Sequence, residues 1–326
     1  MSKIIKVIFF AVLGIVLIFS GLILWIVYAK PNIKSPVDLK VEITDNRVER
    51  GKYLANNVTV CMDCHSKRDW NRFSGPLTEG TFGQGGEEFN QQLGFPGKFF
   101  SKNITPYALS NWSDGEIYRA ITSGVGKDGR PLFPVMPYLN YRSLSKEDVY
   151  SIIAYLRTLK PVKNDVEASV ADFPMSIIMH LIPKEAQHEE IPDTSNKTAY
   201  GKYLTNAAGC IECHSMQEKG KKISGMEFAG GMNFPLVTGG IVRSANITPD
   251  KETGIGDWTE TTFVSRFKAY ADSSYEAPKV NKGDYNSYMP WIMYAHMKES
   301  DLGAIYAYLQ SLKPIENKVE KFSMNN

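Results

Sequence analysis

Two hydrophobic patterns divide the chain into regions that predict different structures. An uncharged apolar run of about 22 residues follows Lys3 and Lys6 and extends from Val7 to Tyr28. As a helix rising about 1.5 Å per residue, it would measure about 33 Å, enough to cross the hydrocarbon core of a membrane. The basic residues before the run predict a cytoplasmic N-terminus, with everything after Lys30 outside. A cleaved secretory signal is the alternative, although the run is longer than a usual signal core.

A second pattern, with helical spacing, recurs near the end of each half of the chain. Its apolar members are Val149, Ile152, Ile153, Leu156 and Leu159 in the first half, and Leu302, Ile305, Tyr306, Leu309 and Leu312 in the second. Ser145 with Asp148 resembles a capping box, whereas Lys298 replaces that serine in the second copy. A Lys-Pro pair is expected to end both helices. The pattern therefore predicts a mostly α fold, in which these stripes are core packing.

The two halves also repeat several short motifs about 150 residues apart. The shared positions are Gly51-Lys-Tyr-Leu with Gly201-Lys-Tyr-Leu, Asn103-Ile-Thr-Pro with Asn246-Ile-Thr-Pro, Trp112 with Trp258, and Met136-Pro with Met289-Pro. The repeat predicts a duplicated domain. We expect a transmembrane anchor at 1–30, a linker at 31–47, a first domain at 48–162, an interdomain strap at 163–198, a second domain at 199–316 and a C-terminal tail at 317–326. The apolar centre of the strap, 173–183, is expected to pack on a domain, with docking to a partner or to the bilayer as alternatives.

All four cysteines fall in two copies of Cys-x-x-Cys-His, at residues 61–65 and 210–214. This spacing is the attachment signature of c-type haem, in which two thiols form thioethers and the adjacent imidazole binds the iron. The sequence therefore predicts two covalent haem c groups. The predicted attachment residues are Cys61, Cys64, Cys210 and Cys213, and the predicted proximal iron ligands are His65 and His214.

Three other uses of these cysteines are less consistent with the pattern. A disulfide framework or a redox dithiol would leave the two histidines at the same offset unexplained. Structural zinc requires further ligands, and neither motif is followed by a second His or Cys pair at finger-like spacing.

The second axial ligand decides whether a haem transfers electrons or binds small molecules. Met136 is the only methionine between His65 and the end of the first domain helix. In the second half only Met289 shares the following proline and the register of the repeat, so we predict Met136 and Met289 as ligands. The competing methionines are Met216, Met226, Met232, Met293 and Met297. His296 is a rival ligand, but we expect a surface or structural role for it, as for His180 and His188.

An asparagine and a tryptophan lie between each attachment site and its methionine. Asn103, Trp112, Asn246 and Trp258 have N–H groups that could support the propionates or the ligand sulfur. The alternative, a turn-forming Asn beside a packed Trp, is equally consistent with the sequence. The net charge is +2, from 37 basic and 35 acidic residues, and indicates no nucleic-acid partner.

Taken together, these motifs resemble tandem class I cytochrome c domains. They are similar to the membrane-bound cytochrome c subunits of periplasmic alcohol, aldehyde and gluconate dehydrogenases over about residues 48–316. The resemblance implies an electron-transfer protein, not an enzyme, in the inner membrane with its haem domains in the periplasm. Its partners would be a periplasmic dehydrogenase subunit or respiratory donor and a quinone, terminal oxidase or soluble cytochrome. A dihaem peroxidase, which requires an open iron, is the alternative from another class.

Overall fold

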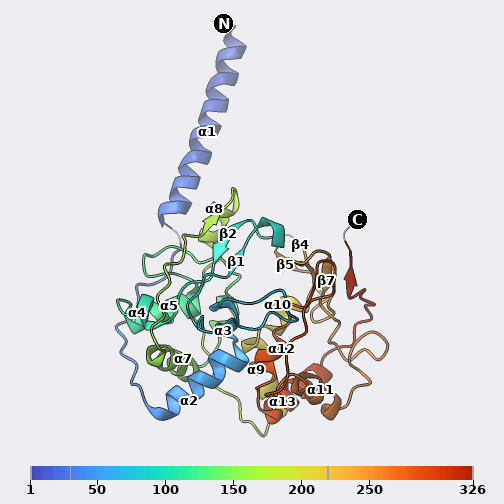
Figure 1. Cartoon of the computed structure of the whole chain (residues 1–326). Helices are drawn as coiled ribbons and strands as arrows, with labels where there is room; N and C mark the ends of the chain where they lie inside the picture. Colours follow the sequence, from blue (N-terminus) through green and yellow to red (C-terminus); the bar gives the residue numbers. More distant parts are fainter. Residues whose placement is uncertain (1, 30, 219, 325–326) are drawn as a thin grey trace.

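The computed structural model describes residues 2–29, 31–218 and 220–324, arranged as one long helix and a compact helical body (Figure 1). Helix α1, Lys3–Ala29, has no buried residue and extends away from the body. By length and composition it could cross a membrane, although an N-terminal signal sequence would pass the same test. The predicted apolar helix is therefore confirmed, and its role as an anchor stays a prediction.

The body contains two successive sets of helices. The first half comprises α2 (Asp45–Tyr53), a π-helical turn η1 (Leu54–Val58), α3 (Cys61–Cys64), α4 (Pro106–Leu109), α5 (Asp114–Ser123), α6 (Tyr138–Tyr141) and α7 (Lys146–Thr158). The second half comprises α9 (Lys197–Ala207), α10 (Cys210–Cys213), α11 (Glu260–Lys268), α12 (Trp291–Tyr294) and α13 (Glu299–Gln310). The last helix of each half, α7 and α13, ends before its Lys-Pro pair, as predicted. Their order shows that the repeated motifs fold into corresponding elements.

The repeated glycines explain how the first and last helices of each half pack together. A Cβ atom built on Gly51 in α2 would lie 1.8 Å from the carbonyl oxygen of Ser151 in α7. A Cβ atom on Gly201 in α9 would lie at the same 1.8 Å from the carbonyl oxygen of Ala304 in α13. Only glycine permits so close an approach of two backbones, which explains why both halves have a glycine at this position.

Short antiparallel strands supplement the helices, and the sequence pattern did not predict them. One sheet has the order β1-β2-β3, a hairpin joins β4 and β5, and a third sheet has the order β6-β7-β8. The strands are β1 (Glu88–Phe89), β2 (Gly97–Phe100), β3 (Val170–Ala171), β4 (Gln217–Glu218), β5 (Lys221–Lys222), β6 (Asn233–Pro235), β7 (Ile241–Arg243) and β8 (Phe322–Ser323). A short 3-10 turn, η2 (Gln91–Leu93), precedes β2. Strand β8 places part of the predicted C-terminal tail against the second half.

The strap between the halves differs from its prediction. Its strand β3 pairs with β2 of the first half, and it continues into α8 (Met175–Ile178) and the 3-10 turn η3 (Met179–Leu181). Both α8 and η3 contact α1 (Figure 1). Phe173 and Leu181 are 78% and 53% exposed, so the expectation that the apolar centre packs on a domain is wrong for these side chains.

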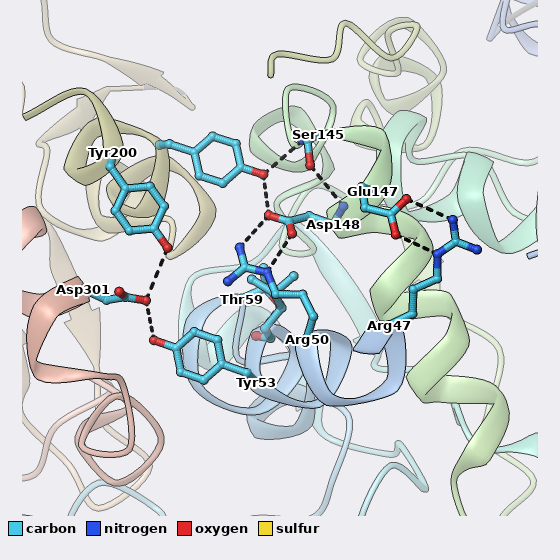
Figure 2. Close-up of polar contacts among 11 residues, drawn as sticks. Arg47, Arg50, Tyr53, Thr59, Ser145, Glu147, Asp148, Tyr200 and Asp301 are labelled. Atoms are coloured by element: carbon cyan, nitrogen blue, oxygen red, sulfur yellow. Dashed lines mark hydrogen bonds and ion pairs between the residues drawn. The ribbon is translucent and has the colours of Figure 1, made fainter. Parts of the chain in front are cut away.

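Two tyrosines cross between the halves and bind buried carboxylates. The hydroxyl of Tyr53 donates to Asp301 at 2.7 Å (Figure 2). The hydroxyl of Tyr203 donates to Asp148 at 2.6 Å. Arg50 also binds Asp148, at 2.8 Å. Because Tyr53 and Tyr203 occupy the same position of the repeat, the contacts form a reciprocal pair. Buried apolar residues of both halves belong to one contiguous core.

The predicted capping box at α7 is only half formed. The hydroxyl of Ser145 accepts from the backbone N–H of Asp148 at 3.0 Å, as expected for an N-cap. The carboxylate of Asp148, however, binds Arg50 and Tyr203 instead of the Ser145 backbone. The Ser145 N–H donates to the Tyr203 hydroxyl at 3.1 Å. Lys298 forms no side-chain cap on α13, as predicted, and its N–H donates to the Tyr53 hydroxyl at 3.1 Å.

Candidate functional site

Each Cys-x-x-Cys segment forms a single helical turn after a residue with left-handed backbone. Val60 (φ 44) precedes α3, and Gly209 (φ 66) precedes α10. The backbone N–H of His65 donates to Cys61 O, and that of His214 donates to Cys210 O, both at 2.9 Å. The turn therefore places two thiols three residues apart and the imidazole directly after them, with the same local backbone geometry in both halves.

Both imidazoles are oriented through Nδ1. His65 Nδ1 lies 2.6 Å from Lys102 O, and His214 Nδ1 lies 2.7 Å from Ala245 O. A carbonyl only accepts, so Nδ1 carries the proton and Nε2 keeps its lone pair for a metal. Burial lowers the pKa of both histidines, which favours the neutral ligand form. The arrangement suits an iron ligand in each half.

The four cysteines fit thioether formation better than the other uses of thiols. All four lie in the described part of the chain, and none forms a disulfide. Burial raises the pKa of Cys61, and raises those of Cys64 and Cys210 to about 12. A redox dithiol requires a lowered thiol pKa instead. Within the described residues, no group of three or more His, Cys, Asp or Glu side chains is placed to hold a metal ion.

The predicted methionines occupy matching places at the starts of α6 and α12. Both are partly buried against the core. The Met136 carbonyl accepts from the Tyr138 N–H at 2.8 Å, and the Met289 carbonyl accepts from the Trp291 N–H at 2.8 Å. The two methionine carbonyls make the same backbone contact, so Met289 is the structural counterpart of Met136, as the sequence repeat predicts.

A tyrosine connects each methionine segment to the attachment segment. Tyr141 in α6 donates its hydroxyl hydrogen to Thr59 O at 2.9 Å, and Tyr294 in α12 donates to Ala208 O at 2.7 Å. Thr59 and Ala208 lie just before the two Cys-x-x-Cys motifs. These tyrosines were not predicted, although both lie five residues after the methionine of a Met-Pro pair, a repeated spacing that could have identified them.

The two asparagines contribute to loop structure. The amide group of Asn103 donates to Val162 O at 2.8 Å, and its oxygen accepts from the Thr105 N–H at 2.9 Å. Asn246 repeats this, donating to Ile315 O at 2.7 Å and accepting from the Thr248 N–H at 3.0 Å. Their amide hydrogens are thus engaged by backbone carbonyls, and the turn-forming alternative accounts for their contacts.

Trp112 and Trp258 are partly buried against the hydrophobic core. Their backbone carbonyls accept from the Arg157 guanidinium and the Tyr306 hydroxyl, each at 2.5 Å. Trp112 and Trp258 therefore have a packing role in the structure, and any indole contact to a bound haem stays a prediction.

Two of the three remaining histidines lie in positions that suit the structural roles expected for them. His188 lies between the Tyr118 hydroxyl and the Leu144 carbonyl, and contacts both through its ring nitrogens. His296 is exposed at the end of α12. His180, in η3, lies in the strap as expected. Met297, one of the rival methionines, is 1% exposed and packs in the core.

A buried ion cluster beside the first attachment motif was not predicted. The Arg68 guanidinium contacts Asp63 at 2.7 Å and Glu87 at 3.2 Å. The Trp70 indole N–H donates to Glu87 at 2.7 Å. Burial raises the pKa of Asp63, and the neighbouring Arg68 opposes that rise. In the second half Glu212, at the position of Asp63, binds the half-exposed Lys222 at 2.7 Å.

Comparisons with known proteins agree with this geometry. The cytochrome c subunit of alcohol dehydrogenase (quinone) from Gluconacetobacter polyoxogenes is 27% identical over 284 residues, 82% of this chain and 56% of that protein. The gluconate 2-dehydrogenase cytochrome c subunit of Pantoea cypripedii is 28% identical over 83% of this chain and 60% of that protein. A diheme cytochrome c-type protein of Cereibacter sphaeroides is 26% identical over 78% of this chain and 83% of its own length.

The chain thus spans less than two thirds of the two dehydrogenase subunits that it resembles. The names of these relatives agree with the prediction of an electron-transfer protein that is not itself an enzyme, and they give no support to a peroxidase. A sequence profile of the cytochrome c family matches residues 198–313. Residues 198–313 are therefore similar to a cytochrome c domain, and proteins of that family bind haem c covalently.

Proposed function

We propose that the chain is a membrane-anchored dihaem cytochrome c that transfers single electrons outside the cytoplasmic membrane. The observation that carries this proposal is the repetition of one site in both halves. In each half an imidazole with a free Nε2 follows two cysteines, and a tyrosine ties that segment to a methionine segment. The matching halves support two cytochrome c domains, at 48–162 and 199–316.

In this proposal Cys61 and Cys64 attach one haem, and Cys210 and Cys213 attach the other. His65 with Met136 would hold the iron of the first haem, and His214 with Met289 would hold the iron of the second. When bound, each haem iron supplies a one-electron redox centre. The surrounding chain holds the ligands in place, keeps the imidazoles neutral and excludes water, so that a change of charge requires little rearrangement. A thioether on the second side also blocks access of small molecules to the iron.

The interface between the halves supports electron transfer between two centres. The reciprocal contacts of Tyr53 with Asp301 and of Tyr203 with Asp148 join the halves through buried carboxylates (Figure 2). The shared core adds apolar contact on the same interface. A fixed relative orientation of the halves would keep the distance between the two haems constant during turnover.

The proposed membrane orientation places the N-terminus in the cytoplasm and the body in the periplasm. Support comes from the apolar α1 and from the exposed Phe173 and Leu181 of the strap, which lies beside α1. The relatives suggest a dehydrogenase as electron donor. A quinone, terminal oxidase or soluble cytochrome would be the acceptor.

Intact-mass spectrometry of protein made in a host that assembles c-type cytochromes tests the number of haems. The natural chain should carry two haem masses. The double variant Cys61→Ser with Cys64→Ser should lose one, and Cys210→Ser with Cys213→Ser should lose the other. Reduction by a purified quinone-dependent dehydrogenase, followed spectrophotometrically, tests the direction of transfer. A chain with one haem, or one that no dehydrogenase reduces, would contradict the proposal.

A further inference from the structure

A loop of the first half reaches across to the second half and lies against the segment that contains Met289. The Phe73 N–H donates to Pro278 O at 2.9 Å, and the Val280 N–H donates to Asn71 O at 2.8 Å. The Arg72 guanidinium donates to Ala277 O at 3.0 Å. The residues that follow Phe73 are therefore placed by the other half of the molecule.

Ser74, in this loop, contacts the methionine segment directly. Its hydroxyl donates to Met289 O at 2.6 Å and accepts from the Trp291 N–H at 3.3 Å. Its backbone N–H donates to the side-chain oxygen of Asn286 at 2.9 Å. One buried hydroxyl thus bridges the residues on either side of Pro290.

The burial and backbone conformation of Ser74 indicate that its contact with the second half is well defined. Ser74 is 3% exposed, and Asn286 is 2% exposed. Ser74 has φ 61, a left-handed conformation that a residue with a Cβ atom rarely adopts and that persists only where its surroundings determine it. The amide of Asn286 donates to Trp70 O at 3.2 Å, which closes a polar network across the interface.

Met289 is consequently fixed from both sides of its backbone. Its N–H donates to the Ser287 hydroxyl at 3.1 Å, and its carbonyl accepts from Ser74 of the other half. Met136 differs, because its N–H donates to Phe133 O at 3.4 Å and its carbonyl accepts from Tyr138, both within its own half. The two methionine segments therefore depend on different parts of the molecule.

We propose that Ser74 is a positioning residue through which the first half holds the Met289 sulfur at the second haem. This inference rests on the proposed function, in which Met289 is an axial ligand. Its consequence is that ligation of the second haem depends on Ser74 of the first half, whereas ligation of the first haem does not depend on Ser74.

The variant Ser74→Gly tests this in the full-length protein. Glycine accepts the positive φ, so the backbone and its contact with Asn286 are retained while the hydroxyl is removed. Loss of the hydrogen bonds of this hydroxyl should raise the fraction of second haem without its methionine about fivefold to tenfold. Carbon monoxide binding to the reduced protein measures this fraction, and the methionine methyl resonances identify the haem after assignment with Met136→Ala and Met289→Ala.

Ser143→Ala provides the matched control. The Ser143 hydroxyl accepts from Asn206 of the other half at 2.9 Å, so this variant also removes a serine contact between the halves, but one away from Met289. The proposal predicts a change at the second haem in Ser74→Gly and in the second variant Ser74→Ala, and none in Ser143→Ala. Equal spectra for all three would overturn it, provided that Met289→Ala opens the second haem. If Met289→Ala opens neither haem, the ligand assignment itself fails.

Discussion

The first and second halves share a scaffold but differ in how their polar contacts are made. Both have a glycine at the helix crossing, a carbonyl-bound imidazole and a tyrosine that connects the methionine and cysteine segments. They differ beside the attachment motif, where Asp63 has a buried arginine partner and Glu212 has a half-exposed lysine. They differ again at the methionines, because only Met289 is held by Ser74 of the other half.

Some contacts are therefore common to both halves, and others occur in only one of them. The contacts that hold the attachment turn and orient its imidazole occur in both halves. Contacts at the junction between the copies have become specific to one side. We therefore expect substitutions in repeated contacts to act alike in the two halves, and substitutions in the unique contacts to act unequally.

The largest difference in stability between the halves is expected when the cation beside each attachment motif is removed. Arg68→Met leaves Asp63 and Glu87 buried without their cation, which should lower the free energy of unfolding by about 3–5 kcal/mol. Lys222→Met removes a half-exposed pair and should cost about 0–1 kcal/mol. Urea unfolding followed by circular dichroism measures both. Equal losses would show that the Arg68 cluster is not buried as described.

The loss of stability in Arg68→Met should also depend on pH. Burial already raises the pKa of Asp63, and removing Arg68 should raise it further. An acid with a raised pKa in the folded state takes up a proton more readily there than when unfolded. The destabilisation should therefore shrink as pH falls below the folded pKa and grow as pH rises.

The repeated glycines should behave alike. Gly51→Ala and Gly201→Ala each place a Cβ atom within 1.8 Å of a backbone carbonyl oxygen, so the helices must separate. Overpacking of this kind costs about 1–3 kcal/mol, and sometimes more. Gly303→Ala is the control, because its Cβ would meet only the Glu260 side chain, which can move. Thermal unfolding compares the three, and a stable Gly51→Ala protein would contradict the close helix crossing.

Substitutions of the two reciprocal tyrosines, Tyr53 and Tyr203, should lower the free energy of unfolding by different amounts. Tyr203→Phe leaves Asp148 bound to Arg50, whereas Tyr53→Phe leaves Asp301 with the Tyr200 hydroxyl at 3.5 Å. Removing a donor to a buried carboxylate costs about 1–3 kcal/mol, so Tyr53→Phe should lie at the upper end and Tyr203→Phe at the lower. Chemical unfolding of both variants measures the difference, and the reverse order would indicate that Arg50 does not compensate.

The smallest signal is expected at the membrane side of the first half. In liposomes of phosphatidylcholine with a photoactivatable acyl chain, the full-length protein should be cross-linked in α1 and at Phe173 and Leu181. Val237, in the second half and 62% exposed, is the control and should remain unlabelled. Labelling of α1 alone would show that the strap does not touch lipid, and an unlabelled α1 would contradict the anchor.

Local repetition made much of the site predictable from sequence. The attachment turns, the glycine crossings and the uncapped start at Lys298 follow from residue type and spacing. The cross-half contacts of Tyr53 and Tyr203 did not, because their partners lie in the other copy and nothing in the local pattern names them. Arg68 occurs only in the first half, and the partners of Ser74 lie in the other copy, so the repeat gave no signal for these contacts either. The short strands have too few residues to show an alternating pattern.

Electron paramagnetic resonance of the oxidised full-length protein tests the central claim most directly, because the spin state of each iron reports its axial ligands. The account predicts two low-spin signals, with Met136→Ala and Met289→Ala each converting one of them while both covalent haems remain attached. A high-spin signal in the natural protein, or a methionine variant that changes neither iron, would contradict a pair of closed electron-transfer centres.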